Sequence, residues 1–214
     1  VANEERMSEA YKNGVDLHRQ TASLVLDKPI DDITKEDRQL AKAVNFGLLY
    51  GQSAKGLVAY AKKAYGVEME YERARDIRSR FFSAYTGLRE WHKTARKMAA
   101  ESTQSVRTVS GRVQWLPQGK EAKWPRFTSL VNTPVQGGSA DALKQAMVDL
   151  SDKLRHTASI VSTVHDELIV ECASDNADEV KALVETVMLD AVQTMFQGVR
   201  FEVEAGIYES WAEK

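Results

Sequence analysis

Four residues in the segment 38–51, read as RQLAKAVNFGLLYG, recur at intervals of four: Arg38, Lys42, Phe46 and Tyr50. On an α-helix such residues lie one above another and form a stripe, here about 18 Å long. Arg and Lys donate hydrogen bonds to phosphate oxygens, and two flat rings suit a sugar and a base. The stripe therefore favours a nucleoside triphosphate site. The alternative is an ordinary amphipathic helix with two snorkelling cations and two half-buried rings.

Two adjacent carboxylates, Asp166 and Glu167, follow His165 between the strand-like runs 160–164 and 168–170. A hairpin formed by these runs would hold both carboxylates at its tip. Mg²⁺ prefers carboxylate oxygens and keeps further positions for water and phosphate. The sequence thus predicts a metal-binding hairpin, and a solvated acidic turn is the alternative.

A third polar group lies in the segment 132–138, read as NTPVQGG. Asn132 and Gln136 each carry a donor and an acceptor, so they could read base edges in a minor groove. Pro134 and the paired glycines predict a tight turn. The alternative is that both amides bond to the local loop backbone.

The elements that must position these residues follow from hydrophobic periodicity. Leu40, Ala41, Val44 and Leu48 form an apolar face opposite the basic and aromatic stripe. The segment 34–37, Thr-Lys-Glu-Asp, fits a capping box, and Gly51 lies where a left-handed cap would end the helix. Elsewhere the patterns predict helices at 1–26 (with a break at Asn13–Gly14), 53–65, 71–98 and 177–196, and a further helix that follows Gly138. They also predict a hairpin at 107–116 and a half-buried strand at 199–207.

Composition limits the class of protein. A chain of 214 residues with 43% hydrophobic and 28% charged content fits a globular protein of one or two domains. Its longest apolar run falls short of the ~20 residues of a membrane span. One cysteine, Cys172, excludes an internal disulfide and a cysteine-based zinc site. We expect an intracellular protein, cytoplasmic or nucleoid-associated, without a membrane partner.

Charge is distributed unevenly along the chain. Residues 73–126 hold 13 Lys or Arg against 4 Asp or Glu, a local net charge of +9, although the whole chain carries −2. This asymmetry is typical of a protein that binds a polyanion, and a solvated basic helix face is the alternative. The chain begins with Val1 and not with Met, so we expect a fragment, a processed product or one piece of a longer protein.

Taken together, the Arg-Lys-Phe-Tyr helix, the Asn-Gln turn and the His-Asp-Glu hairpin resemble, in order and separation, those of family A DNA polymerases, the DNA polymerase I type. The resemblance covers essentially all 214 residues. It implies an α+β fold with a helical fingers subdomain and part of an antiparallel palm sheet with packed helices. Residues 1–19 would follow the first catalytic strand, 20–125 would be fingers with a nucleotide-binding helix at 35–51, and 126–214 would be the C-terminal palm portion.

The resemblance also implies an activity, which is template-directed transfer of a nucleotide from a dNTP to a primer 3′-hydroxyl with two Mg²⁺ ions. The residue roles that it implies are as follows: Asp166 and Glu167 as catalytic metal ligands, Lys42 as a catalytic residue that could act as an acid, Arg38, Lys42 and His18 on phosphates, Phe46 and Tyr50 on the sugar and base, and Asn132, Gln136, His165 and Arg112 on primer-template DNA. His18 taken alone would be an ordinary surface or capping histidine.

Two departures from the family pattern limit this interpretation. Thr128 stands where the family usually has an Arg, and whether nearby Arg126 substitutes is open. The family's first catalytic strand carries a metal-binding Asp, and that strand would precede Val1. We therefore expect this chain to be inactive alone and to need a second polypeptide that carries the strand, the thumb and any exonuclease domain. A non-catalytic nucleic-acid-binding or assembly subunit is the alternative.

Overall fold

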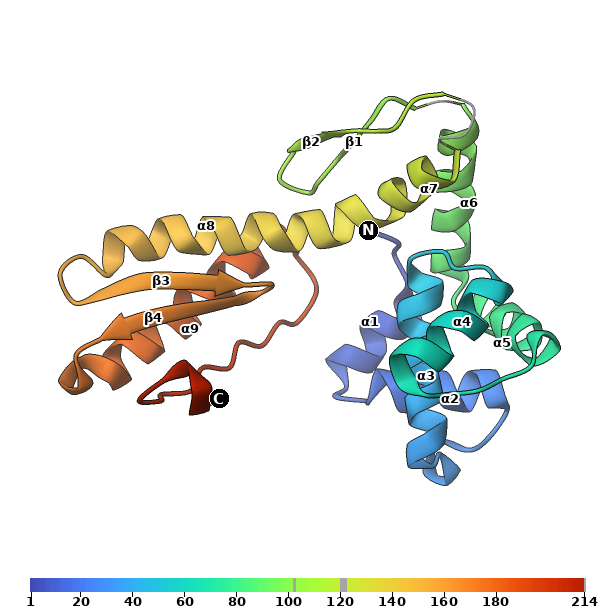
Figure 1. Cartoon of the computed structure of the whole chain (residues 1–214), viewed down its shortest axis with the longest axis horizontal. Helices are drawn as coiled ribbons and strands as arrows, with labels where there is room; N and C mark the ends of the chain where they lie inside the picture. The colour runs from blue at the N-terminus through green and yellow to red at the C-terminus, as the bar shows by residue number, and fades with distance from the viewer. Residues whose placement is uncertain (102, 120–122, 214) are drawn as a thin grey trace. The chain divides into compact units, whose positions relative to one another are not determined.

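The computed structural model describes residues 1–101, 103–119 and 123–213 of the chain. It divides into two compact units, the first of Val1–Val106 and Val113–Thr133, the second of Arg107–Arg112 and Pro134–Lys214. Figure 1 labels the helices and strands of both units.

The first unit is mainly helical. Its elements are α1 (Glu5–Lys12), α2 (Leu17–Leu26), a 3₁₀ turn at Ile30–Asp32, α3 (Lys35–Leu49), α4 (Ala54–Tyr65), α5 (Tyr71–Ala84), α6 (Thr86–Ala100), the short strands β1 (Ser105–Arg107) and β2 (Val113–Trp115), and α7 (Lys123–Asn132). The helices α2, α3, α4 and α5 surround a core that includes Leu48, Leu57, Phe81 and Tyr85, each 0% exposed. Burial of these large apolar side chains is the main stabilising contribution in this unit.

The sequence predictions for α3 are confirmed. Thr34 and Asp37 form the capping box, because each side chain accepts a hydrogen bond from the other residue's backbone N–H. At the other end, Gly51 has φ +86°, and the N–H groups of Gly51 and Gln52 donate to Leu48 O and Gly47 O at 3.0 Å each. These two bonds form a Schellman motif. The apolar face of α3 is buried as expected.

The predicted single helix at 71–98 is wrong, because the chain breaks at Tyr85 into α5 and α6. Tyr85 is 0% exposed, and its backbone leaves the helical region with φ −106° and ψ 76°. The new N-terminus of α6 is capped by Glu4, whose Oε2 accepts from Gly87 N at 2.8 Å and from Leu88 N at 3.4 Å. This cap lies 83 residues away along the chain, so local periodicity cannot reveal the break.

The break at residues 13–16 is confirmed, since α1 ends at Lys12 and α2 begins at Leu17. Tyr11, in the last turn of α1, is 55% exposed. A tyrosine tolerates this position because its hydroxyl end is polar.

The predicted tight turn at 132–138 is also wrong. The backbone stays helical, with α7 followed by a π-helical turn at Thr133–Gly137 and then by α8 (Gly138–Lys153). Pro134 has no N–H to donate to a helical ladder, and in this chain it lies within the single π-helical turn that joins α7 to α8.

The second unit is an antiparallel hairpin packed on two helices, α8 and α9 (Ala177–Met195) (Figure 1). The strands β3 (Ala158–Val164) and β4 (Glu167–Cys172) pair with Val164 opposite Glu167, and a register irregularity lies between Ile160 and Ser162. The core unites Leu150 of α8 and Val187 of α9 with the partly buried strand residues Ile160 and Leu168. The α+β class predicted from the sequence is thus confirmed.

The strand predicted at 199–207 is wrong. The segment is extended, and Phe201, Val203 and Ala205 are half-buried while their neighbours are exposed. A strand also requires a partner, and none of the described residues pairs with this segment through a β-ladder. Instead, Ala205 N donates to Glu185 Oε1 of α9 at 3.0 Å.

Within the described part of the chain, every helix is too short or too polar to cross a membrane.

The end of α3 generates a stability prediction. Gly51 and Gly66 both have positive φ after a helix, but a Cβ on Gly51 would collide with the Phe127 ring, whereas a Cβ on Gly66 would meet open space. Gly66→Ala should therefore lower the free energy of unfolding by about 1 kcal/mol, from backbone strain alone. Gly51→Ala should lower it by about 2–4 kcal/mol, because Phe127 must also move.

Urea unfolding of both variants, followed by circular dichroism, checks this difference. Equal losses in the two variants would show that the contact between Gly51 and Phe127 contributes nothing to stability.

Candidate functional site

The working face of α3 carries Arg38, Lys42 and Phe46 on the side away from its buried residues. Phe46 is 45% exposed, and the Arg38 side chain is 37% exposed. Tyr50 lies just beyond the last helical residue, at the C-cap position with φ −94° and ψ 15°. The helix thus presents two cations and one ring to solvent, and Tyr50 is half-buried where the helix ends.

Asp16 holds Arg38 in place. This aspartate is the N-cap of α2, and its Oδ1 accepts from the backbone N–H groups of His18 and Arg19 at 2.9 and 3.1 Å. Its Oδ2 accepts from Arg38 Nε at 2.7 Å. Burial acts to raise the pKa of Asp16, but the bonds from Arg38, Arg19 and His18 outweigh it and lower the pKa overall. The Asp16 carboxylate therefore both caps the N-terminus of α2 and orients the Arg38 guanidinium on α3.

His18 is held by a directional chain of hydrogen bonds that begins in the core. The hydroxyl groups of Tyr85 and Thr21 lie 2.7 Å apart, and Thr21 Oγ1 donates to Asn45 Oδ1 at 3.0 Å. The Asn45 amide then lies 2.9 Å from His18 Nδ1. Because Asn45 Oδ1 is already an acceptor, its Nδ2 must be the donor to His18. Nδ1 of His18 is then an acceptor, and the ring proton is on Nε2.

The surroundings of His18 favour its neutral form. Burial lowers the pKa of His18, and although Asp16 acts to raise it, Arg38 and Lys42 lower it further. The ring centroids of His18 and Phe46 lie 6.0 Å apart. The site therefore combines an imidazole N–H donor with two fixed cations and an exposed ring, an arrangement that suits an anionic ligand with a flat group.

The carboxylate hairpin is formed as the sequence predicted. His165 and Asp166 make a two-residue turn, with His165 at φ +57°, and Glu167 is the first residue of β4. All three residues are exposed. Two hard oxygen donors on a paired strand end fit part of a Mg²⁺ site. Within the described residues, no group of three or more His, Cys, Asp or Glu gathers to complete such a site.

Arg112 is engaged inside the second unit. Its Nε donates to Asp141 Oδ1 at 2.6 Å, and its Nη2 donates to Gly137 O at 3.1 Å. Burial acts to raise the pKa of Asp141, but bonds from Ser110, Thr108 and Arg112 lower it overall. Asp141 lies in the first turn of α8, where a carboxylate is favourable. The Arg112 side chain as a whole keeps 43% exposure.

Asn132 and Gln136 lie in different surroundings. Asn132 ends α7, and its Oδ1 is buried without a hydrogen-bond partner in the described part of the chain. Gln136 is exposed in the π-helical turn. An orphaned buried amide oxygen is uncommon and indicates a site that a ligand or water can satisfy.

Arg126 was the candidate to substitute for the family arginine at the position of Thr128, but it is buried. It is 2% exposed, and its guanidinium donates to Ala99 O at 2.7 Å, Pro117 O at 3.1 Å and Gly119 O at 3.4 Å. Arg126 therefore holds the 117–119 backbone against the C-terminal end of α6, and does not replace a surface arginine at Thr128. Thr128 itself bonds locally to Pro125 O at 3.0 Å.

Sequence reasoning missed Asp16 and Asn45. A detectable signal existed for Asn45, which is a polar residue inside the apolar face of α3 and is 2% exposed. Such a residue requires partners, but the sequence does not name them. Asp16 has the residue type of an N-cap, and nothing in the sequence links it to Arg38.

Comparison with known proteins finds one matching family and several relatives. A model of the family described as DNA polymerase family A matches residues 1–213. DNA polymerase I of Aquifex aeolicus is 43% identical over 208 residues, which are 96% of this chain and 35% of that protein. DNA polymerase I of Pseudomonas aeruginosa is 34% identical over 221 residues, covering 100% of this chain and 23% of the relative.

A solved structure is also similar. The POL domain of Pol1 from M. smegmatis, in complex with DNA primer-template and dNTP, has a TM-score of 0.76 and 29% identity, covering 89% of this chain and 34% of that one. The chain thus spans about a third or less of the length of these relatives.

The hydrogen bond between Asn45 and His18 generates the next prediction. Asn45→Ala removes a donor that favours neutral His18, so the pKa of His18 should rise towards its usual value of about 6.5. In the unchanged protein, the pKa of His18 is lower in the folded state than its unfolded value of about 6.5. The contribution of His18 to the free energy of unfolding is therefore full above about pH 6.5, and it is lost as the pH falls through the lowered pKa of the folded state.

Long-range ¹H–¹⁵N spectra of labelled histidines measure both the tautomer and the titration. The Nε2–H tautomer is expected for His18, and the signals of His156, which lies in the other unit, should be the same in both proteins. A His18 proton on Nδ1 in the unchanged protein would contradict the directional chain.

Proposed function

The chain belongs to DNA polymerase family A, and we propose that it supplies the nucleotide-binding fingers and part of the palm for template-directed DNA synthesis. In this reaction a primer 3′-hydroxyl attacks the α-phosphorus of a dNTP, and pyrophosphate leaves. The observation that carries the proposal is the working face of α3, where Arg38, Lys42 and His18 converge beside exposed Phe46.

On the nucleotide side, each side chain has a distinct role. Arg38 and Lys42 bind oxygens of the triphosphate, and the Nε2–H of His18 donates to the same group. Phe46 and Tyr50 lie further along the helix and shape the pocket for the sugar and the base. Lys42 also supplies positive charge where pyrophosphate leaves, and can act there as an acid.

On the metal side, Asp166 and Glu167 would hold Mg²⁺ through carboxylate oxygens. When bound, two such ions stabilise the attacking and the leaving oxygens. Among the described residues, no group of three or more His, Cys, Asp or Glu that could hold a metal ion forms. We therefore propose that a further carboxylate comes from another segment or polypeptide, and that this chain is inactive alone.

DNA contacts are proposed for Asn132, Gln136, His165 and Arg112. The orphaned Oδ1 of Asn132 and the exposed amide of Gln136 have the donors and acceptors that minor-groove edges require. The Arg112 side chain is 43% exposed, so it can lie beside a backbone phosphate. The similar M. smegmatis domain was solved with primer-template DNA and dNTP, which supports the same partners here.

For the subdomains we propose residues 1–19 as the segment that joins palm to fingers, 20–125 as fingers, and 126–214 as the C-terminal palm portion. The two compact units support a division in this region, because the first runs to Thr133 apart from Arg107–Arg112.

Primer extension tests this function. The chain is assayed with Mg²⁺, four dNTPs and primer-template, with and without a polypeptide that carries the further carboxylate strand and the thumb. Extension is expected only with both polypeptides. Robust extension by the 214-residue chain alone would contradict the need for a partner.

In the active pair, Asp166→Asn should reduce extension by about 10³-fold, because several kcal/mol of charge stabilisation is lost. Asp175→Asn makes the same charge change at an exposed residue in the turn Ser174–Asn176, and should leave extension unchanged. If the pair binds DNA but never extends a primer, the chain is a non-catalytic nucleic-acid-binding subunit.

A further inference from the structure

A buried histidine of α6 contacts the C-terminal end of α3. His92 is 1% exposed, and its Nε2 lies 2.9 Å from Leu49 O, although the two residues are 43 positions apart in the chain. A carbonyl oxygen can only accept, so Nε2 carries the proton and donates it. Leu49 is the last residue of α3, and a helix leaves the carbonyl groups of its last turn without partners inside the helix. His92 supplies the missing partner.

Two neighbouring carbonyl groups at this end of α3 are satisfied by the backbone alone. Gly47 O accepts from Gln52 N, and Leu48 O accepts from Gly51 N. Within the described part of the chain, no backbone N–H donates to Leu49 O. The last carbonyl of α3 therefore depends on a side chain from another helix, whereas the two before it depend on the local turn.

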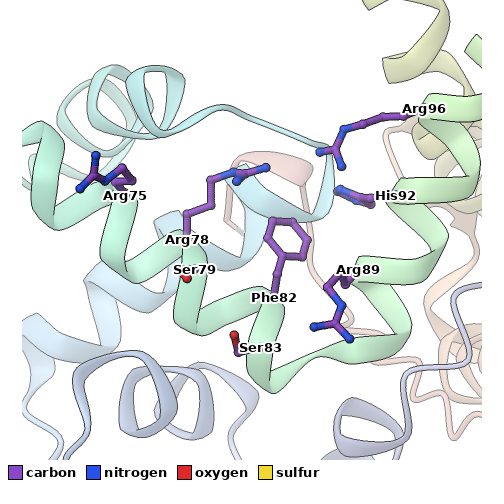
Figure 2. A pocket seen from close by; sticks show the side chains of 8 residues that line it. All are labelled: Arg75, Arg78, Ser79, Phe82, Ser83, Arg89, His92 and Arg96. Atoms are coloured by element: carbon purple, nitrogen blue, oxygen red, sulfur yellow. The ribbon is translucent and has the colours of Figure 1, made fainter. Parts of the chain in front are cut away.

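Aromatic rings from two other helices hold the imidazole of His92 in place. Its centroid lies 5.2 Å from that of Phe82 in α5 and 5.7 Å from that of Phe127 in α7, and the Phe127 ring is tilted by 84° to it. Figure 2 shows the His92 side chain leaving α6 towards Phe82 and Arg78 of α5. Edge-to-face ring contacts of this kind favour one ring orientation, so the Nε2 donor has a fixed direction.

The surroundings of His92 favour a neutral ring with a single N–H. Burial lowers the pKa of His92, and although the bond to Leu49 O acts to raise it, Arg96 and Arg78 lower it further. In a neutral imidazole one nitrogen donates and the other accepts. Nδ1 is therefore the acceptor, and it is buried without a hydrogen-bond partner among the described residues. The only donor of the ring is the one that bonds to α3.

This hydrogen bond acts directly on the backbone of Tyr50. The carbonyl of Leu49 and the N–H of Tyr50 belong to one planar peptide unit, so a donor that fixes the carbonyl also fixes the point from which the Tyr50 side chain leaves. On the other side of Tyr50, Gly51 lies so close to the Phe127 ring that a Cβ would collide with it. His92 and Phe127 thus hold the residues that flank Tyr50, just where the helical ladder of α3 ends.

We propose that His92 is a positioning residue of the nucleotide site: through its hydrogen bond to Leu49 O, it holds Tyr50 in the orientation that receives the base and sugar of a nucleotide. His92 acts through Tyr50 and does not itself contact the nucleotide. The inference rests on the proposed function, which makes Tyr50 a nucleotide contact. The hold of His92 on the end of α3 does not rest on it.

The phosphate-binding residues are held by other contacts. Arg38 is bonded to Asp16, and His18 is bonded to Asn45. None of these four residues belongs to α6. Loss of the bond from α6 should therefore impair recognition of the base and sugar and spare recognition of the phosphates.

Two substitutions separate the hydrogen bond of His92 from its volume. His92→Met keeps a long apolar side chain in the buried site but has no donor, so Leu49 O is left without a partner. His92→Gln is the matched control, because its side-chain amide can donate in place of Nε2. Circular dichroism verifies that both variants are folded.

Amide hydrogen exchange of the full 214-residue chain measures the hold on α3. The amides of Gly51 and Gln52 should exchange about tenfold faster in His92→Met than in the unchanged protein, and within about twofold of it in His92→Gln. Gly66 and Val67 close the end of α4 through backbone bonds alone, so their exchange should not change. Equal acceleration at the ends of both helices would overturn the proposal, because the whole unit would then have loosened.

Titrations with dTTP and with inorganic triphosphate, followed through the backbone amide signals of Tyr50 and His18, test the positioning. Binding of dTTP should weaken by about three- to tenfold in His92→Met and return to within about twofold in His92→Gln. Inorganic triphosphate has no base or sugar, so it should bind all three proteins equally. Equal weakening of both ligands, or no recovery in His92→Gln, would overturn the proposal.

Failure of the proposed function has a different result. If the unchanged protein binds neither dTTP nor inorganic triphosphate, α3 is not a nucleotide site, and the proposed function is rejected together with the role of Tyr50. If the unchanged protein binds dTTP and His92→Met binds it equally well, the proposed function stands and only the positioning role of His92 is rejected.

Discussion

The hydrogen bond from Asn45 to His18 connects the core of the first unit to the working face of α3. It is the last step of a chain that starts at Tyr85, passes through Thr21, and ends at an imidazole beside two cations. Tyr85 is also the residue at which α5 ends, and Glu4 caps the helix that follows. The path of the backbone and the tautomer of His18 therefore depend on the same buried side chain. A buried polar network of this kind stabilises one arrangement only when every member is satisfied.

Electrostatics then explains why the working face suits an anion. Arg38 is oriented by Asp16, which also caps α2, so part of its charge is balanced before any ligand arrives. Within the described part of the chain, no carboxylate forms an ion pair with Lys42. Burial lowers the pKa of His18, and both cations lower it further. A triphosphate would add the missing negative charge beside a prearranged donor set, so little reorganisation is needed on binding.

Much of this arrangement could be predicted from the sequence. The capping box of α3, its buried face, the Schellman glycine and the carboxylate hairpin all depend on residues close together in the chain. The failures depend on distant partners. The break at Tyr85 needs Glu4, and the extended segment at 199–207 bonds to α9 and not to a strand. The proline and glycines near Thr133–Gly137 predicted a tight turn, but a π-helical turn keeps this stretch helical. Asp16 and Asn45 were missed because their roles are defined by residues on other helices.

The central claim is that His18, Arg38 and Lys42 form one triphosphate site, and histidine NMR tests it most directly. The ¹⁵N-labelled chain is titrated with a dNTP while the His18 signals are followed. The account predicts a saturable shift of the His18 Nε2 signal and a rise in the pKa of His18, because negative charge beside the ring favours its protonated form. Lys42→Ala should weaken this response by about tenfold or more, while His156 in the other unit should not respond. An unchanged His18 signal at saturating dNTP, or equal shifts at His18 and His156, would contradict the account.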